Sequence, residues 1–450
     1  MNLKRSLLAL LLLALSWPAA LGTARAQAVA PSPKPASPGL YIPPSCQGRP
    51  LVAKAPPGAV QAPYAPQPNL PLTTAQQLQV FRGLVNAIND LYVYPDFNGR
   101  DWPGLVARYR ARVESGLDTE TFYAEMQKLV SELGDEHSYF LSPARVAEDE
   151  ARLAATRDFV GVGLLMMPLL ETNRVSILAV FPDSSALHGG LKPHDSILAV
   201  DGIPLVENGK PYPQRVLGPD CSAAVFTVQS PGHSARRLTL VRHRQSAALP
   251  IDARLVPTTD GSRIGYIFLP TFFDKSVPVQ VRKALQEFGP LDALILDNRM
   301  NGGGAGSVLM PILSHFTSGT LGHFVKRAAR RPMEITPDTV HNSQTVPLVI
   351  LVSKNTVSYG EVFSGALQDT GRAKIVGQTT KGNVETLHGA TFADGSKLWI
   401  AAERFDPRVS HANWENQGVK PDVEVLAEWD TFTFADDPAV AAAVRLLGHK

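Results

Sequence analysis

The sequence is poor in the cysteines and the regularly spaced histidines that mark disulfide-rich and metal-binding proteins. It has only two cysteines, Cys46 and Cys221, among 450 residues. Two are too few for a disulfide framework or a thiolate metal site, although they could pair in an oxidising compartment, and the sequence alone leaves that pairing open. The 11 histidines are scattered without an H-x-x-x-H spacing, so the sequence predicts no metal site and no cofactor.

Long apolar runs and an excess of one charge are also missing. Beyond residue 26 no segment has the roughly 18 continuous apolar residues that a membrane-spanning helix requires, so no integral span is expected. Lys and Arg number 43 against 41 Asp and Glu. Such a balance, without a basic block, argues against nucleic acid as a partner.

The N-terminus has the pattern of an export signal. Lys4 and Arg5 precede an apolar run over residues 7–15, and small residues follow up to an A-x-A site that ends at Ala26. We therefore expect residues 1–26 to be a cleaved signal peptide. Its removal takes away three basic residues and leaves 40 basic and 41 acidic side chains. Residues 27–72 are rich in Pro and Ala, which predicts an extended linker.

Periodicity divides the rest of the chain into three regions. Residues 73–150 show apolar residues three or four apart after a Thr73-Thr74 N-cap, which predicts a helical domain. Residues 151–246 are short β-branched runs separated by turn signals. Residues 247–450 alternate buried-type strands with helical patterns, which predicts an α/β domain. The expected fold class is multi-domain α+β.

The β-rich region resembles a circularly permuted PDZ domain of the bacterial kind. The match rests on Gly161-Val162-Gly163-Leu164, on a "PDSSA" stretch from Pro182, on "GLKP" from Gly190 and on "DSI…VDG" from Asp195. The resemblance implies that residues 161–164 bind peptide and that amides there capture a C-terminal carboxylate. His194 departs from the pattern, because that family usually has glycine at this position.

A serine stands at the turn between an expected strand, 348–352, and an expected helix, 361–370. Ser358 in "NTVSYGEVF" lies at or just before the N-terminus of that helix. Free amides and the positive end of the helix would face an oxyanion formed beside its hydroxyl, as at a nucleophile elbow. The alternative is that Ser358 only caps the helix.

Three consecutive glycines form a second candidate element. Gly302, Gly303 and Gly304 follow "LDNRMN" at the end of an expected strand. Glycine lets backbone amides approach a reacting carbonyl, which suits an oxyanion hole. A P-loop is excluded because no Gly-Lys-Ser/Thr follows, and a plain flexible turn is the other alternative.

The order of these motifs resembles the S41 family of serine peptidases, which includes carboxyl-terminal processing proteases and tricorn-type relatives. The match begins at about Thr73 of this chain and runs to its end. In the order typical of that family it contains the helical region, the PDZ-like region, "LILDNRMNGGG", "TVSYGE" and "WENQGVKPD". The resemblance implies a ClpP/crotonase-like α/β core with Ser358 as nucleophile. It also implies an oxyanion hole built from the Tyr359 amide and a glycine amide at Gly302 or Gly303.

The identity of the general base is open at the level of sequence. The processing-protease branch uses a lysine four residues before a glutamine; "TTKGNVETL" matches that pattern only with a two-residue deletion, which aligns Lys381 and Glu385. The tricorn-type branch uses histidine and glutamate, and resemblance to its segments proposes His137 as base and Glu415 as the carboxylate that orients it. The rival bases are His388 and His411.

The function expected from these features is that of an exported serine endopeptidase. It would bind polypeptide substrates through their C-terminal tails and cleave them with Ser358, in a bacterial periplasm or outside the cell. Two alternatives remain: a catalytically degenerate PDZ receptor, motivated by the altered lysine motif, and a binder of apolar ligands on the same fold. The oligomeric state is not predicted.

Overall fold

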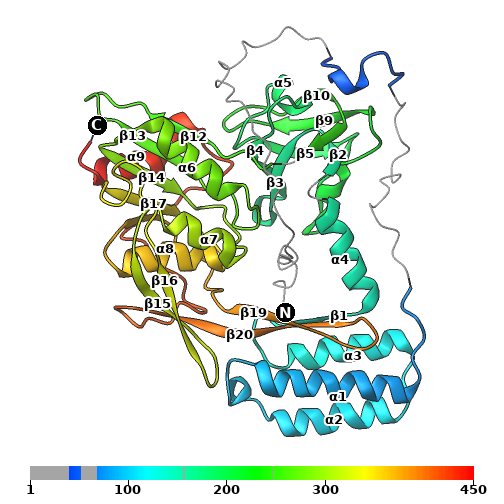
Figure 1. Cartoon of the computed structure of the whole chain (residues 1–450). Coiled ribbons are helices and arrows are strands. Elements are labelled where there is room, and N and C mark those ends of the chain that lie inside the picture. The colour runs from blue at the N-terminus through cyan, green and yellow to red at the C-terminus, as the bar shows by residue number, and fades with distance from the viewer. Residues whose placement is uncertain (1–39, 52–67, 156–157, 247, 450) are drawn as a thin grey trace, which may run out of the picture. The chain divides into compact units, whose positions relative to one another are not determined.

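The computed structural model describes residues 40–51, 68–155, 158–246 and 248–449 (Figure 1). The expected signal peptide and most of the expected linker lie outside these residues. The fold is a mixed α+β arrangement of several sheets. It divides into two compact units, and the first takes Thr156–Pro250, Ala427–Asp437 and the described part of Met1–Ala62. The second unit takes Pro63–Ala155, Ile251–Leu426 and Pro438–Lys450.

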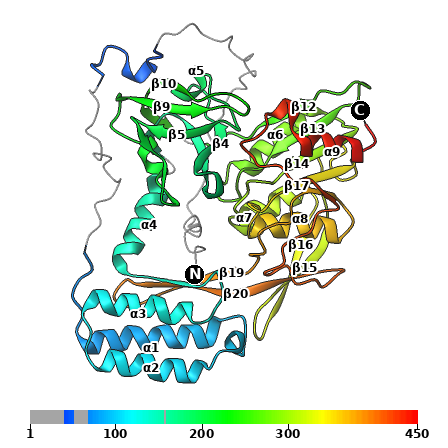
Figure 2. The ribbon, with the colours of Figure 1, turned by 180° about the vertical axis from the view of Figure 1, so that it is seen from behind.

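In the second unit, three long helices pack under a sheet. The helix α1 begins at a capping box in which Thr73 and Gln76 satisfy each other's backbone amides, which confirms the expected N-cap. Its buried residues share one core with Leu398 and Ile400 of β20. Both views show the three helices side by side, and α3 and α1 are the ones that contact β1 and β20 respectively (Figure 1, Figure 2). The helices are α1 (Thr74–Leu91), α2 (Trp102–Glu114) and α3 (Thr119–Ser131), followed by α4 (Pro143–Ala155).

The sheet over these helices has the order β1-β20-β15-β16, with β19 also paired to β20. Its pairings are antiparallel. Through β1 and β20 it ties the helical region to the C-terminal half of the chain. The strands are β1 (Tyr139–Leu141), β15 (Gly319–Val325), β16 (Arg330–Ile335), β19 (Thr386–Thr391) and β20 (Lys397–Pro407).

The other sheet of the second unit is mainly parallel, in the order β12-β13-β14-β17-β18-β21. Its central strands β13, β14 and β17 are buried at every position, as their uninterrupted apolar runs predict. The strands are β12 (Ala253–Val256), β13 (Ile264–Phe268), β14 (Ala293–Asp297), β17 (Leu348–Val352), β18 (Lys374–Gly377) and β21 (Val423–Glu424). The accompanying helices are α6 (Val277–Phe288), α7 (Gly306–Leu313), α8 (Tyr359–Asp369) and α9 (Pro438–Leu446).

The first unit is built on an antiparallel sheet in the order β10-β9-β5-β4-β3, with β6 paired to β5. The strand β3 is therefore at an edge of this sheet. The strands of the sheet are β3 (Leu164–Leu169), β4 (Arg174–Val180), β5 (Ser196–Val200), β6 (Ile203–Pro204), β9 (Ala223–Gln229) and β10 (Arg236–Val241). The remaining elements are β2 (Asp158–Gly161), α5 (Ser185–His188), β7 (Val206–Glu207), β8 (Lys210–Pro211) and β11 (His243–Ser246).

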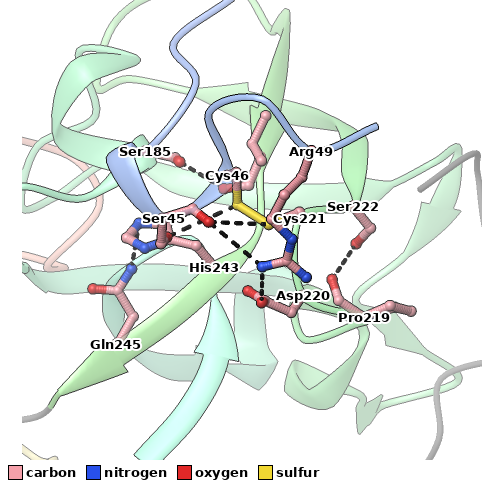
Figure 3. Close-up of a disulfide and its surroundings, with 11 residues drawn as sticks. Ser45, Cys46, Arg49, Ser185, Pro219, Asp220, Cys221, Ser222, His243 and Gln245 are labelled. Atoms are coloured by element: carbon pink, nitrogen blue, oxygen red, sulfur yellow. Dashed lines mark hydrogen bonds and ion pairs between the residues drawn. A yellow bond between two sulfur atoms is a disulfide. The ribbon is translucent and has the colours of Figure 1, made fainter. Parts of the chain in front are cut away.

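A disulfide and a distant segment complete the first unit. Cys46 pairs with Cys221 across 175 residues, which answers the question left open by the sequence, and Arg49 forms an ion pair with Asp220 beside it (Figure 3). The segment 427–437 brings Trp429, which stacks on His194 with ring centroids 4.0 Å apart. His194 has a φ of 76°, the conformation that glycine adopts easily, and its Nδ1 bonds to the Trp429 carbonyl at 2.8 Å.

Candidate active site

Ser358 stands between a strand and a helix of the central parallel sheet. The strand β17 ends at Val352, and α8 begins at Tyr359, two residues before the expected start. Ser358 has φ 56° and ψ −126°, a backbone conformation that is uncommon for a residue with a side chain. Such strain persists only where the surroundings fix it, and it is typical of functional turns.

A buried carboxylate holds this turn in place. Glu361, in the first turn of α8, accepts hydrogen bonds from the Ser358 amide at 3.1 Å and the Thr380 hydroxyl at 2.6 Å. It also accepts from the amides of Gly382 at 2.6 Å and Asn383 at 2.8 Å. Burial raises the pKa of Glu361, and these donors oppose that rise. Glu361 therefore fastens the loop 380–383 to the serine turn.

The glycine loop packs directly against Ser358. Gly303 has φ 90°, and a Cβ placed on it would lie 2.7 Å from the Cβ of Ser358 and 3.1 Å from the Tyr359 nitrogen. The Gly303 amide donates to the Asn301 side chain at 2.9 Å. In the described part of the chain, the amides of Gly302 and Tyr359 donate to no protein acceptor. Of the two glycines named from the sequence, Gly302 thus has the amide that is available to an oxyanion.

His137 and Glu415 form a buried pair in the same unit. His137 follows α3, and its Nε2 lies 2.9 Å from Oε1 of Glu415. The other Glu415 oxygen accepts from the Val384 amide at 3.0 Å, which fixes the carboxylate. Burial lowers the pKa of His137, but the hydrogen bond to Glu415 and the charges of Glu415, Glu385 and Asp135 outweigh it, so the pKa is raised.

One short segment joins this pair to the serine turn. The Asn383 carbonyl accepts from the Ser358 amide at 2.9 Å. The next residue, Val384, donates to Glu415, and the one after it, Glu385, lies beside His137. Three consecutive residues thus contact Ser358, Glu415 and His137 in turn.

Glu385 also belongs to this group, and no function was assigned to it from the sequence. The one sequence feature that singled it out was the gapped match of "KGNVE" to the lysine motif. Its Oε2 lies 4.0 Å from His137 Nε2, and its Oε1 accepts from the Tyr94 hydroxyl. Burial, followed by the charge of Glu415, raises the pKa of Glu385 to about 7 against the opposing effects of His137 and Tyr94. One ligand atom each from His137, Glu385 and Glu415 lie within 4.8 Å of one another, so the group could hold a metal ion.

The rival bases lie in different surroundings. The Lys381 side chain is 42% exposed and forms an ion pair with Glu136 at 3.6 Å. His388 and His411 are 35% and 62% exposed, and each faces another carboxylate, Glu403 at 3.9 Å and Asp406 at 2.9 Å respectively. None of the three has the burial that His137 has.

The expected peptide-binding residues lie in the first unit. Gly161 ends β2 and Leu164 begins β3, so residues 161–164 form the turn that leads into the edge strand. The carbonyl of Val162 accepts from the Ala186 amide and that of Gly163 from the Phe181 amide, each at 3.0 Å. A Cβ on Gly163 would lie 2.2 Å from the Cβ of Ser184, so glycine is required there. These residues belong to a different compact unit from Ser358.

Comparison with protein families gives two matches. Residues 263–425 match the model described as peptidase family S41, and residues 74–130 match the model described as the tricorn protease C1 domain. The first match contains Ser358, Gly302, Gly303, Tyr359 and Glu415, whereas His137 lies outside both. No helix among the described residues combines the length and the apolar character needed to cross a bilayer.

Individual relatives are carboxyl-terminal-processing proteases. The chain is 28% identical over 370 residues to such a protease of a Synechocystis species, covering 80% of this chain and 84% of the relative. It is 29% identical over 351 residues to the chloroplastic carboxyl-terminal-processing peptidase 2 of Arabidopsis thaliana, covering 74% and 66%. A solved photosystem II D1 C-terminal processing protease superposes with a TM-score of 0.57 at 25% identity, covering 84% and 98%. A putative S41 protease from Bacteroides fragilis superposes with the same TM-score at 15% identity, covering 81% and 96%, a likeness of fold.

Proposed function

This chain belongs to peptidase family S41, a family of serine peptidases, and from that premise we propose that it is an exported endopeptidase that cleaves polypeptides with Ser358, His137 and Glu415. The observation that carries the proposal is the run from Asn383 to Glu385, which contacts the serine turn and the His137–Glu415 pair in succession. A buried, oriented histidine next to a strained serine turn is the arrangement that a Ser-His-carboxylate mechanism needs.

In the proposed mechanism each group has one role. Because His137 Nε2 lies on Glu415, Nδ1 is the ring nitrogen left for the serine hydroxyl. His137 takes the proton from Ser358 Oγ as the Oγ–carbon bond forms at the scissile carbonyl. The amides of Gly302 and Tyr359 stabilise the resulting oxyanion. His137 then gives the proton to the leaving amine as the C–N bond breaks, and water hydrolyses the acyl-enzyme.

The first unit is proposed to be a PDZ-like domain that binds substrate tails. Its edge strand β3 can accept an extended peptide as an added strand, and the turn at residues 161–164 uses its carbonyls internally, which leaves amides for a terminal carboxylate. The second unit would then be a helical domain on a ClpP/crotonase-like core. Export to a periplasm or the extracellular space is supported by the signal-like N-terminus and by the disulfide, since disulfides persist in oxidising compartments.

The role of the tail can be tested with paired peptides. A fluorogenic peptide with a free C-terminal carboxylate is compared with the same peptide amidated at its C-terminus, and each is tested on the wild-type protein and on Gly163→Val. Tail binding predicts that amidation of the peptide lowers kcat/KM of the wild type by tenfold or more, which corresponds to ~1.4 kcal/mol or more of lost binding free energy. In Gly163→Val, amidation should have little further effect on kcat/KM. Equal hydrolysis of both peptides by wild type would refute tail recognition while leaving the peptidase assignment intact.

A further inference from the structure

A cluster of metal-type ligands surrounds the proposed base. His137, Glu385 and Glu415 come from three distant parts of the sequence, so no spacing motif reveals them. The two distances from His137 Nε2, 2.9 Å to Glu415 and 4.0 Å to Glu385, bracket the roughly 3.3 Å between ligand atoms of a tetrahedral zinc site with bonds near 2.0–2.1 Å. Small movements of the two carboxylates would therefore complete such a site.

An unpaired oxygen points to a missing partner. The Glu385 side chain is 1% exposed, and among the described residues its Oε2 has no hydrogen-bond donor, while its Oε1 is bonded to Tyr94. A buried carboxylate oxygen without a donor is unfavourable. The basic atom beside it is His137 Nε2, 4.0 Å away, which is too long for a hydrogen bond. A cation between Glu385, Glu415 and His137 would satisfy this oxygen.

We propose that His137, Glu385 and Glu415 bind a zinc ion and that the bound ion inhibits the peptidase. One imidazole and two carboxylates form a ligand set that zinc commonly takes, with a fourth position open. Magnesium and calcium fit less well, since they prefer six or more oxygen ligands and rarely bind imidazole. The two carboxylates also balance the charge of a divalent ion.

Inhibition follows from the chemistry of the imidazole ring. A metal binds the lone pair of a ring nitrogen, so zinc on Nε2 leaves the ring proton on Nδ1. That nitrogen can then donate but cannot accept the proton of Ser358. The ion also displaces the hydrogen bond between His137 and Glu415. The inhibition rests on the proposed role of His137, whereas the binding does not.

Binding is measured first, without reference to activity. The purified protein, with its disulfide intact, is freed of metals by a chelator and exchanged into chelator-free buffer, and zinc is titrated in competition with a chromophoric indicator. Glu385→Gln keeps the shape and the acceptor for Tyr94 but removes the anionic ligand, and Glu415→Gln tests the second carboxylate. His411→Asn is the matched control. His411 also pairs with a carboxylate, that of Asp406, at 2.9 Å, but within the described ranges no third metal-type ligand lies beside this pair.

We expect one zinc per chain in wild type and in His411→Asn, and affinity reduced by about tenfold or more in each glutamine variant. Thermal unfolding checks that each variant is folded, and zinc should raise the Tm of wild type more than that of Glu385→Gln. Glu385→Gln binding zinc as tightly as wild type, or His411→Asn losing the ion, would overturn the proposed site.

Peptide hydrolysis supplies the second readout. Zinc at the concentration that fills the site should abolish hydrolysis by wild type, and a chelator should restore it. The inhibitory concentration should rise by about the same factor as the dissociation constant in Glu385→Gln. Active protein that binds one zinc without inhibition would refute the regulatory part. A metal-free protein that hydrolyses nothing would instead count against the proposed function, and the binding titration would stand by itself.

Discussion

The serine turn illustrates how single residues are constrained at the site. Ser358 keeps its left-handed conformation because its amide is shared between the Asn383 carbonyl and the Glu361 carboxylate, while Gly303 packs against its Cβ. The contacts with Glu361 and Gly303 each depend on one particular residue type. A glycine is needed where two backbones meet, and a carboxylate where several donors converge.

A methyl group at Gly303 should therefore impair catalysis more than folding. In Gly303→Ala the new Cβ would lie 2.7 Å from the Ser358 Cβ and 3.0 Å from the Val357 carbonyl, so the serine and the Tyr359 amide must move. We expect kcat to fall by about 10²–10³-fold, the usual cost of a displaced oxyanion donor. Gly306→Ala is the control, since its Cβ would meet nothing closer than 3.8 Å. Equal kcat in Gly303→Ala and Gly306→Ala would contradict this account of the loop.

At the scale of elements, the parallel sheet of the second unit was predictable, and the antiparallel sheet of the same unit was not. The strands β13, β14 and β17 are continuous apolar runs, and these runs were predicted as buried strands. The hairpin β15–β16 and the pair β19–β20 were missed, because their strands mix apolar residues with Gly, Pro, Arg and Glu and so lack a clear alternation. Their pairing is decided by partners far away in the sequence, such as β1 on β20.

The candidate site likewise combines residues that a local sequence pattern predicts with residues that depend on distant partners. Ser358 and the glycine loop could be placed from local pattern, since each stands where a strand of the parallel sheet ends. The importance of Glu385 could not be predicted in this way. It depends on contacts with Tyr94 and His137, which belong to the helical region and are far from Glu385 in the sequence. The difference in burial between the exposed Lys381 and the buried His137 could likewise not be read from the sequence.

The end of β14 provides a test of pH dependence. Asp297 is buried and bonds to Arg299 at 2.5 Å and to the Tyr266 hydroxyl at 2.7 Å. Burial raises the pKa of Asp297, but the charge and hydrogen bonds of Arg299 outweigh it, and the pKa is lowered. A lowered pKa stabilises the fold above the unfolded-state pKa of about 3.9, and that stability is lost as the pH falls through the folded-state pKa.

Asp297→Asn should thus lower the free energy of unfolding by about 3–5 kcal/mol at pH 7, because the buried Arg299 charge loses the opposite charge of Asp297. The difference between variant and wild type should narrow once the pH falls below about 4. Urea unfolding at a series of pH values measures both effects. A difference that stays constant down to the acid transition would show that the Asp297 charge is not the cause.

At the scale of the whole molecule, the chain enters the first unit more than once. The segment 427–437 lies between β21 and α9, both of the second unit, and packs within the first unit through Trp429. The His194 side chain is held by this contact, which no local pattern could predict. The disulfide adds a second long-range connection, from Cys46 to Cys221.

Removing the disulfide should destabilise the first unit. Cys46→Ser with Cys221→Ser loses a cross-link over 175 residues, for which a loss of about 2–4 kcal/mol is expected. Urea unfolding followed by a probe in the first unit measures the loss. Reductant should produce a similar shift in wild type and none in the double variant. A wild type that is insensitive to reductant, with the disulfide shown to be reduced, would contradict the stabilising role.

The most direct test of the account is labelling of the protein with a fluorophosphonate probe, followed by peptide mapping. Wild type is compared with Ser358→Ala, His137→Ala and Lys381→Ala, after thermal unfolding has shown that each is folded. We expect label on Ser358 that is lost in His137→Ala and retained in Lys381→Ala. Label that survives in His137→Ala and disappears in Lys381→Ala, or a wild type that takes no label on Ser358, would contradict this expectation.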